Sequence, residues 1–137
     1  MDNVAGTSKM ARLYIATGFL YFVVGTILLA FNISGLMPIA RDPIFILLLY
    51  GFVTQLIFGV SYIFVPGVSR HSGTGYRTII VEYALLNVGI IAFESVALTS
   101  QKSVPILFFG LVALLIAVML HAANIWKTII GKKKAAT

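Results

Sequence analysis

The sequence predicts an all-α integral membrane protein, a single domain (1–137) built as an up-down bundle of four transmembrane helices. Hydrophobic residues make up 60% of the chain, charged residues only 10%, and the mean hydropathy is +1.03, whereas about 25% of the residues of a soluble domain are charged. Residues 43–66 form a stretch of 24 residues without a formal charge, and roughly 20 apolar residues span a bilayer. Three further apolar stretches, near 10–31, 78–99 and 104–126, are separated from it by short polar segments.

The first predicted span covers about residues 10–31. A signal peptide is the alternative interpretation, but its apolar region is typically about 7 to 15 residues long and ends at a small-residue cleavage site. The apolar stretch here is longer and is followed by Asn-Ile-Ser-Gly, so we expect a retained span. Gly18 and Gly25 are seven residues apart and fall on nearly the same side of a helix. They are candidates for close helix packing in lipid, or glycines without such a role.

The second predicted span, 43–66, follows a short turn in residues 32–42. Asp42 is a good N-cap and Pro43 suits the first helical turn. The sequence predicts that the span ends at Pro66 and Gly67. Thr54 and Gln55 are its strongly polar residues and lie near its middle. Further candidate helix-packing glycines in this span are Gly51 and Gly59.

The third and fourth predicted spans are joined by a turn at 100–103. The third, about 78–99, contains Glu82, Asn87 and Glu94. The fourth, about 104–126, begins with Ser103 as the expected N-cap and Pro105 in the first turn. Its candidate packing residues are the small residues Gly110, Ala113 and Ala117.

The distribution of basic residues predicts that both termini and the 67–77 loop are cytoplasmic, in the cell membrane. Eight Lys and Arg residues fall on the predicted cytoplasmic side and two on the other side. The eight are Lys9, Arg12, Arg70, Arg77, Lys127, Lys132, Lys133 and Lys134, and the two are Arg41 and Lys102. The net charge of +6 therefore indicates orientation and contact with anionic lipid, and no nucleic-acid partner is expected. Tyr14, Tyr62, Tyr76 and Trp126 are expected at the cytoplasmic headgroups.

Polar residues inside the spans are the candidate functional contacts, because facing lipid costs a polar group a few kcal/mol. Gln55 and Asn87 lie near the middle of their helices, so they could pair as packing contacts. Glu82 and His121 each lie about 8 Å inside the cytoplasmic boundary at 1.5 Å rise per residue. They could carry protons, bind a metal, form a structural pair or extend to the interface. Glu94 has no obvious cation nearby and is a candidate contact to another subunit.

Motifs for self-sufficient catalysis are missing from the sequence. The chain has no cysteine, no GxSxG motif and no HExxH motif, which are the signatures of thiolate sites, of serine hydrolases and of zinc proteases. Two histidines and four acidic residues are few for a redox centre. We therefore expect neither an isolated enzyme nor a bound cofactor.

Three segments resemble the short four-helix relatives of haem-copper oxidase subunit I, the cbb3-type subunit-I-like proteins. They are Ala11-Arg12-Leu13-Tyr14, the stretch around Gly51 and Gly59, and the segment from Tyr83 to Gly89 that contains Asn87. The resemblance covers roughly the first 100 residues and implies a four-helix fold in a respiratory or redox setting. The family typically carries a histidine motif before the glycine of the second span. Ile44 and Ile46 stand at the matching positions, which argues against a bound haem.

Two classes of function remain open. The first is a non-catalytic accessory subunit of a larger membrane oxidoreductase, such as a terminal oxidase or a copper membrane monooxygenase of the ammonia or methane type. Its partners would be the lipid bilayer and other integral membrane subunits of the redox complex. The second is a small independent transporter, channel or sensor with Gln55, Glu82, Glu94 and His121 along a path. The small size and few ionisable residues favour the accessory subunit.

Overall fold

The protein is described by a computed structural model that covers residues 2–36, 41–69, 75–99 and 103–130. Its elements are α1 (Asp2–Ile33), α2 (Arg41–Phe45), the π-helix η1 (Ile46–Val53), α3 (Thr54–Ser69), α4 (Tyr76–Thr99) and α5 (Val104–Ile130). Because α2, η1 and α3 follow one another without a gap in the chain, they form a single span. Within these ranges the predicted all-α four-helix bundle is confirmed.

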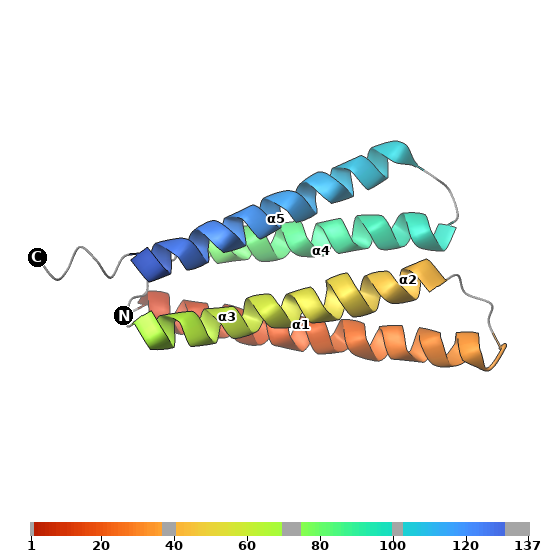
Figure 1. The fold of residues 1–137 in the computed structure, drawn as a ribbon, viewed down its shortest axis with the longest axis horizontal. Coiled ribbons are helices and arrows are strands. Elements are labelled where there is room, and N and C mark those ends of the chain that lie inside the picture. The colour runs from red at the N-terminus through yellow and green to blue at the C-terminus, as the bar shows by residue number, and fades with distance from the viewer. Residues whose placement is uncertain (1, 37–40, 70–74, 100–102, 131–137) are drawn as a thin grey trace, which may run out of the picture.

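The four spans run in alternating directions and form two helical hairpins (Figure 1). α1 packs along η1 and α3, and α4 packs along α5. The start of α1, the end of α3, the start of α4 and the end of α5 lie at one end of the bundle, which we call the terminal end. There, Gly6 of α1 contacts the ring of Tyr76 at the start of α4. The opposite end, where α1 and α4 finish, is called the far end.

The four spans are long and apolar enough to cross a bilayer, which makes this a multi-pass membrane protein by length and composition. They comprise Gly6–Ile33, Arg41–Val65, Tyr76–Thr99 and Val104–Ile130. Large apolar side chains cover their outer surfaces. The side chains of Phe108, Met119 and Leu20 are all more than 60% exposed. In a bilayer these side chains face lipid, where leaving an apolar group exposed carries little penalty.

Two helix boundaries differ from those that the sequence predicts. α2 begins at Arg41, so Asp42 lies in the first turn and is not the N-cap. An acidic side chain there still favours the helix dipole. The prediction that the helix stops at Pro66 and Gly67 is wrong, because α3 continues to Ser69, although the apolar span itself ends at Val65. A proline removes one backbone hydrogen bond, and membrane helices tolerate this loss. The start of α5 agrees with the prediction, since the Ser103 carbonyl accepts a hydrogen bond from the Leu107 amide at 3.1 Å.

The second span contains eight residues of π-helix, Ile46–Val53, between its two α-helical parts. At the transition, the Thr54 amide donates to the Leu49 carbonyl, five residues earlier. The Thr54 hydroxyl donates to the same carbonyl at 3.4 Å. A π-helix is wider than an α-helix and is often found beside a functional site. Here it comes directly before Gln55, which is completely buried.

Small residues let the helices approach closely at every predicted packing position. A Cβ atom at Gly18 would lie 3.1 Å from Gln55, and a Cβ atom at Gly25 would lie 2.9 Å from Leu48. At Gly51 the added atom would lie 2.7 Å from the Tyr21 ring. At Gly59 it would lie 3.0 Å from the Ala11 carbonyl oxygen. On α5, Gly110 lies against α4, and Ala113 and Ala117 are buried. These residues therefore pack the chain's own helices together and do not form a surface for another subunit.

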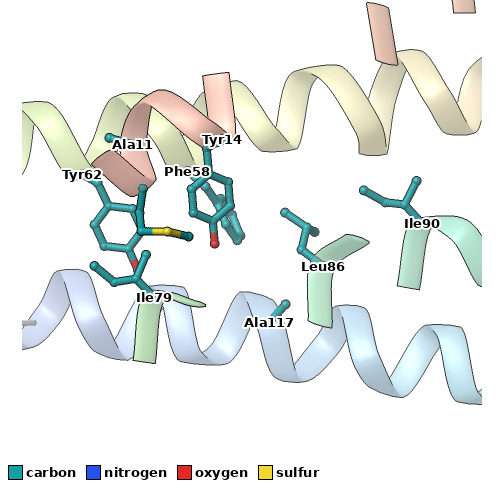
Figure 2. Packing of buried hydrophobic residues seen from close by; sticks show 9 residues of the cluster. Ala11, Tyr14, Phe58, Tyr62, Ile79, Leu86, Ile90 and Ala117 are labelled. Carbon is teal, nitrogen blue, oxygen red and sulfur yellow. The ribbon is translucent and has the colours of Figure 1, made fainter. Parts of the chain in front are cut away.

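The buried apolar cluster lies in the terminal-end half and the middle of the bundle (Figure 2). Its members come from all four spans: Met10, Ala11, Tyr14, Phe58, Tyr62, Ile79, Leu86, Ile90 and Ala117. Two of these residues, Tyr14 and Tyr62, carry hydroxyl groups, which need hydrogen-bond partners when they are buried. The core therefore has to contain acceptors for these groups.

Candidate functional site

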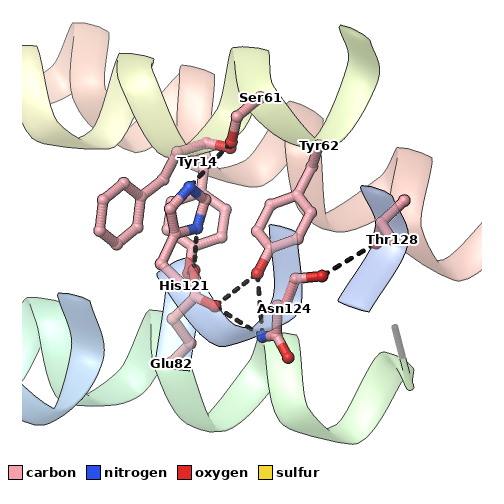
Figure 3. A network of polar contacts seen from close by, with 8 residues as sticks. Tyr14, Ser61, Tyr62, Glu82, His121, Asn124 and Thr128 are labelled. Atoms are coloured by element: carbon pink, nitrogen blue, oxygen red, sulfur yellow. Dashed lines mark hydrogen bonds and ion pairs between the residues drawn. The ribbon is translucent and has the colours of Figure 1, made fainter. Parts of the chain in front are cut away.

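Glu82 of α4 provides those acceptors, and its side chain is completely buried. Its Oε1 accepts a hydrogen bond from the Tyr14 hydroxyl of α1 at 2.9 Å. The same oxygen lies 2.9 Å from Nδ1 of His121 on α5. Its Oε2 accepts from the Tyr62 hydroxyl of α3 and from Nδ2 of Asn124 on α5 at 3.0 Å. One carboxylate therefore joins all four spans (Figure 3).

The donors around Glu82 are also held by one another. Asn124 Nδ2 donates to the Tyr62 hydroxyl oxygen at 3.1 Å. The Thr128 hydroxyl donates to the backbone carbonyl of Asn124 at 2.9 Å. His121, Asn124 and Thr128 are spaced three and four residues apart, so they form a polar stripe on one face of α5. We call Tyr14, Ser61, Tyr62, Glu82, His121, Asn124 and Thr128 the Glu82 network.

Both ring nitrogens of His121 have a hydrogen-bond partner. Its Nε2 lies 2.9 Å from the Ser61 hydroxyl oxygen. The Ser61 hydroxyl also donates to the Phe58 carbonyl at 2.8 Å. On the other side of the ring, Nδ1 faces a carboxylate oxygen. Glu82 and His121 therefore form a buried, hydrogen-bonded carboxylate–imidazole pair.

Aromatic rings fix the orientation of the His121 ring. The Phe58 ring stacks on it with centroids 3.8 Å apart and an angle of 5° between the planes. The Tyr62 ring meets it edge-on at 5.1 Å and 87°. The two rings therefore hold the imidazole plane in the orientation that directs Nδ1 at Glu82.

A second group of polar contacts surrounds Asn87, which follows Glu82 by five residues on α4 and lies closer to the far end. Asn87 Oδ1 accepts from Gln55 Nε2 at 3.0 Å and from the Tyr21 hydroxyl at 2.8 Å. Its Nδ2 donates to the Tyr83 carbonyl at 2.8 Å. The structure thus brings together Gln55 and Asn87, which the sequence placed at the same depth. Thr17 and Tyr83 add a hydroxyl pair at 2.6 Å between α1 and α4.

Glu94 lies apart from both groups. Its two carboxylate oxygens are covered by surrounding atoms and have no hydrogen-bond partner among the described residues. The residue as a whole is partly exposed, but its carboxylate oxygens are not open on the outer surface to a cation of another subunit. Gln55 Oε1 is a second buried acceptor without a partner in the described part of the chain.

The described residues offer no cluster of three or more His, Cys, Asp or Glu side chains that could hold a metal ion. Ile44, at one of the positions where the resembling family carries histidines, is buried in α2. Ile46 lines an apolar groove of about 270 Å³, between η1 and α5. Aliphatic side chains have no atom that can bind iron, so these positions do not fit a haem.

Most of the donors to Glu82 were not predicted from the sequence. Tyr14 and Tyr62 were expected at the headgroups, but both side chains are buried and bonded to Glu82. Trp126, which is 66% exposed, is compatible with the predicted position at the headgroups. For Asn124 the sequence does contain a signal, because its spacing of three residues from His121 indicates a common face of the helix.

Searches of family models, of curated proteins and of solved structures find no match to this chain. The resemblance to subunit I of the haem-copper oxidases thus stays a prediction from the three segments that suggested it.

Proposed function

We propose that this protein is a non-catalytic accessory subunit of a larger membrane oxidoreductase complex. The observation that carries the proposal is the saturation of the Glu82 carboxylate by four donors from the three other spans. A carboxylate that carries ions or substrate has to exchange its partners. Glu82 instead accepts hydrogen bonds that hold the bundle together, which favours a structural role.

The remaining intramembrane polar groups of the terminal-end half support the same role. His121 is held at both ring nitrogens, and Asn124 bonds both to Tyr62 and to Glu82. A rigid bundle with an apolar outer surface is suited to lateral packing in a bilayer. The redox setting, a terminal oxidase or a copper membrane monooxygenase of the ammonia or methane type, is supported by the sequence resemblance alone.

A small independent transporter, channel or sensor is the second candidate. The specific observation in its favour is the pair of unpartnered acceptors in the middle and far-end half, Gln55 Oε1 and the Glu94 carboxylate, among the residues that the structure describes. Intramembrane ionisable residues often mark ion or proton pathways. In this chain, however, Glu82 and His121 would have to leave their bonded positions before they could join such a path.

The accessory role predicts that the protein migrates with larger integral membrane subunits after mild solubilisation of its native membrane. Photoreactive residues placed singly at Leu20, Ile57, Ile91 and Phe108, one exposed position on each span, should crosslink to protein from at least one helix face. Native electrophoresis followed by mass spectrometry of the crosslinked band identifies the partner. Crosslinks to lipid alone, from a protein that migrates by itself, would favour the second candidate.

We further propose that both termini are cytoplasmic, in the cell membrane, because of the excess of Lys and Arg on that side. The chain has no native cysteine, so single cysteines report location without background. A cysteine at Gly75, an exposed residue at the terminal end, should react with a membrane-impermeant maleimide only from the cytoplasmic side. One at Ser34, exposed at the far end, should react only from outside. The reverse labelling would show that the orientation is inverted.

A further inference from the structure

The two intramembrane glutamates of α4 have opposite surroundings. Glu82 accepts four hydrogen bonds and faces His121. Glu94, twelve residues later on the same helix, has two buried oxygens that accept none from the part of the chain that the structure describes. Both carboxyl groups belong to the same membrane-spanning helix. The difference in their hydrogen-bond partners therefore indicates that the two sites favour different states of the carboxyl group.

The charged and titratable groups around Glu94 do not neutralise it. Tyr21 of α1 lies within electrostatic range, but its hydroxyl donates to Asn87. On the neighbouring elements, Arg41 and Asp42 of α2 and Tyr50 of η1 are exposed, and none of them is paired with Glu94. The stretch of α5 from Val104 to Leu120 contains no ionisable side chain. Within the described residues, Glu94 therefore lacks a counter-charge.

The other buried group without a partner among the described residues, at the level of Asn87, which precedes Glu94 by seven residues on α4, adds an acceptor and not a donor. Gln55 is completely buried, and its Nε2 donates to Asn87 while its Oε1 has no partner. Asn87 in turn directs its Nδ2 at the Tyr83 carbonyl. The buried side-chain atoms without a hydrogen-bond partner in the described part of the chain are thus all oxygen atoms. The chemical group that satisfies such atoms carries a proton to donate.

We propose that Glu94 is a proton-binding site, in which the carboxyl group is held as the neutral acid inside the bundle. An ionised carboxylate that is buried without a partner is strongly unfavourable, and such a group takes up a proton instead. Glu94 lies five residues before the end of α4, about 8 Å from the far end at 1.5 Å rise per residue. A proton that leaves or reaches Glu94 therefore has the shorter path through the far end of the bundle. This inference is independent of the accessory role, because it concerns the state of one side chain.

Dicyclohexylcarbodiimide, an apolar carbodiimide that partitions into the bilayer, is the probe that distinguishes the two glutamates. The acid proton of a carboxyl group moves to a carbodiimide nitrogen, and the carboxylate oxygen adds to the central carbon. The resulting O-acylurea rearranges to a stable N-acylurea, so the peptide gains the mass of one carbodiimide with no leaving group. Glu82, bonded as a carboxylate, should not react in this way.

The experiment treats the full-length protein in lipid vesicles and maps the adduct by peptide mass spectrometry. We expect labelling at Glu94, little at Glu82, and loss of the adduct in Glu94→Gln. Labelling of Glu94 should decrease as the pH is raised, because the reaction consumes the acid form. Labelling of Glu82 with none at Glu94 in the folded protein would overturn the proposal.

Infrared spectroscopy tests the same proposal without requiring access of the probe. The carbonyl stretch of a protonated carboxylic acid is separate from the carboxylate bands. Wild-type protein should show this acid band near neutral pH and lose it at high pH, whereas Glu94→Gln should lack it at both. If Glu94 is unlabelled and its replacement removes no acid band, Glu94 is ionised and the proposal is wrong.

Discussion

Replacing Glu82 with glutamine should destabilise the folded bundle by about 3 to 5 kcal/mol, the usual cost of removing one partner from a buried ion pair. The substitution keeps the shape of the side chain but replaces one acceptor oxygen with an NH₂ donor. That donor would face hydroxyl and N–H groups that themselves donate to Glu82. It would also disturb the contact between His121 Nδ1 and the Glu82 carboxylate. Reversible unfolding in mixed detergent micelles measures the change.

The same substitution at Glu94 provides a matched control on the same helix. Glu94→Gln removes an oxygen that accepts no hydrogen bond from the described residues, so its effect on the free energy of unfolding should be small. If both variants unfolded at the same denaturant concentration, the Glu82 network would not be the main polar contribution to stability.

Gly89→Val should force α4 and α5 apart and destabilise the bundle by about 1 to 3 kcal/mol, the range typical of overpacking. A Cβ atom at this position would lie 2.6 Å from Cγ of Leu114 and 3.1 Å from the Gly110 carbonyl oxygen. The Leu114 side chain can rotate, but the carbonyl belongs to the α5 backbone and moves only with the helix. The measurement is again the midpoint of reversible unfolding.

Ala84→Val serves as the control for Gly89→Val, because it places a β-branched side chain on an exposed position of α4. Its effect should be limited to helix propensity, a few tenths of a kcal/mol. A Gly89→Val variant no less stable than Ala84→Val would mean that α5 can repack at no cost.

The spans and their packing residues are largely predictable, because length and apolar character determine whether a segment crosses a bilayer. Gly18, Gly51 and Gly110 all lie at helix contacts, as expected for small residues in lipid. The rise per residue placed Gln55 and Asn87 at one depth, and the two side chains are hydrogen-bonded. Depth along a helix follows from the number of residues and the constant rise per residue, so the sequence is sufficient to determine it.

The rotation of each helix about its axis is what the sequence does not determine. A tyrosine near a boundary suits the headgroup region and the bundle interior equally well, and only the helix rotation decides between them. Tyr14 and Tyr62 point inward to Glu82, whereas the sequence predicts them at the membrane surface. The π-helix at Ile46–Val53 changes the direction in which the side chains of α3, which follows it, point around the helix axis. The residues of the π-helix are ordinary apolar ones, so the sequence pattern does not predict a π-helix there.

The Glu82 network also constrains the order in which the protein can mature. Glu82 lies on the third span to be synthesised, and two of its four donors, His121 and Asn124, lie on the fourth. Until α5 has entered the membrane, Glu82 has only the hydroxyls of Tyr14 and Tyr62 to bond. A nascent chain of three spans therefore carries a half-satisfied carboxylate within a hydrophobic segment. Insertion of α5 supplies the two remaining partners, so the hydrogen bonding of Glu82 is complete only once that helix is in place.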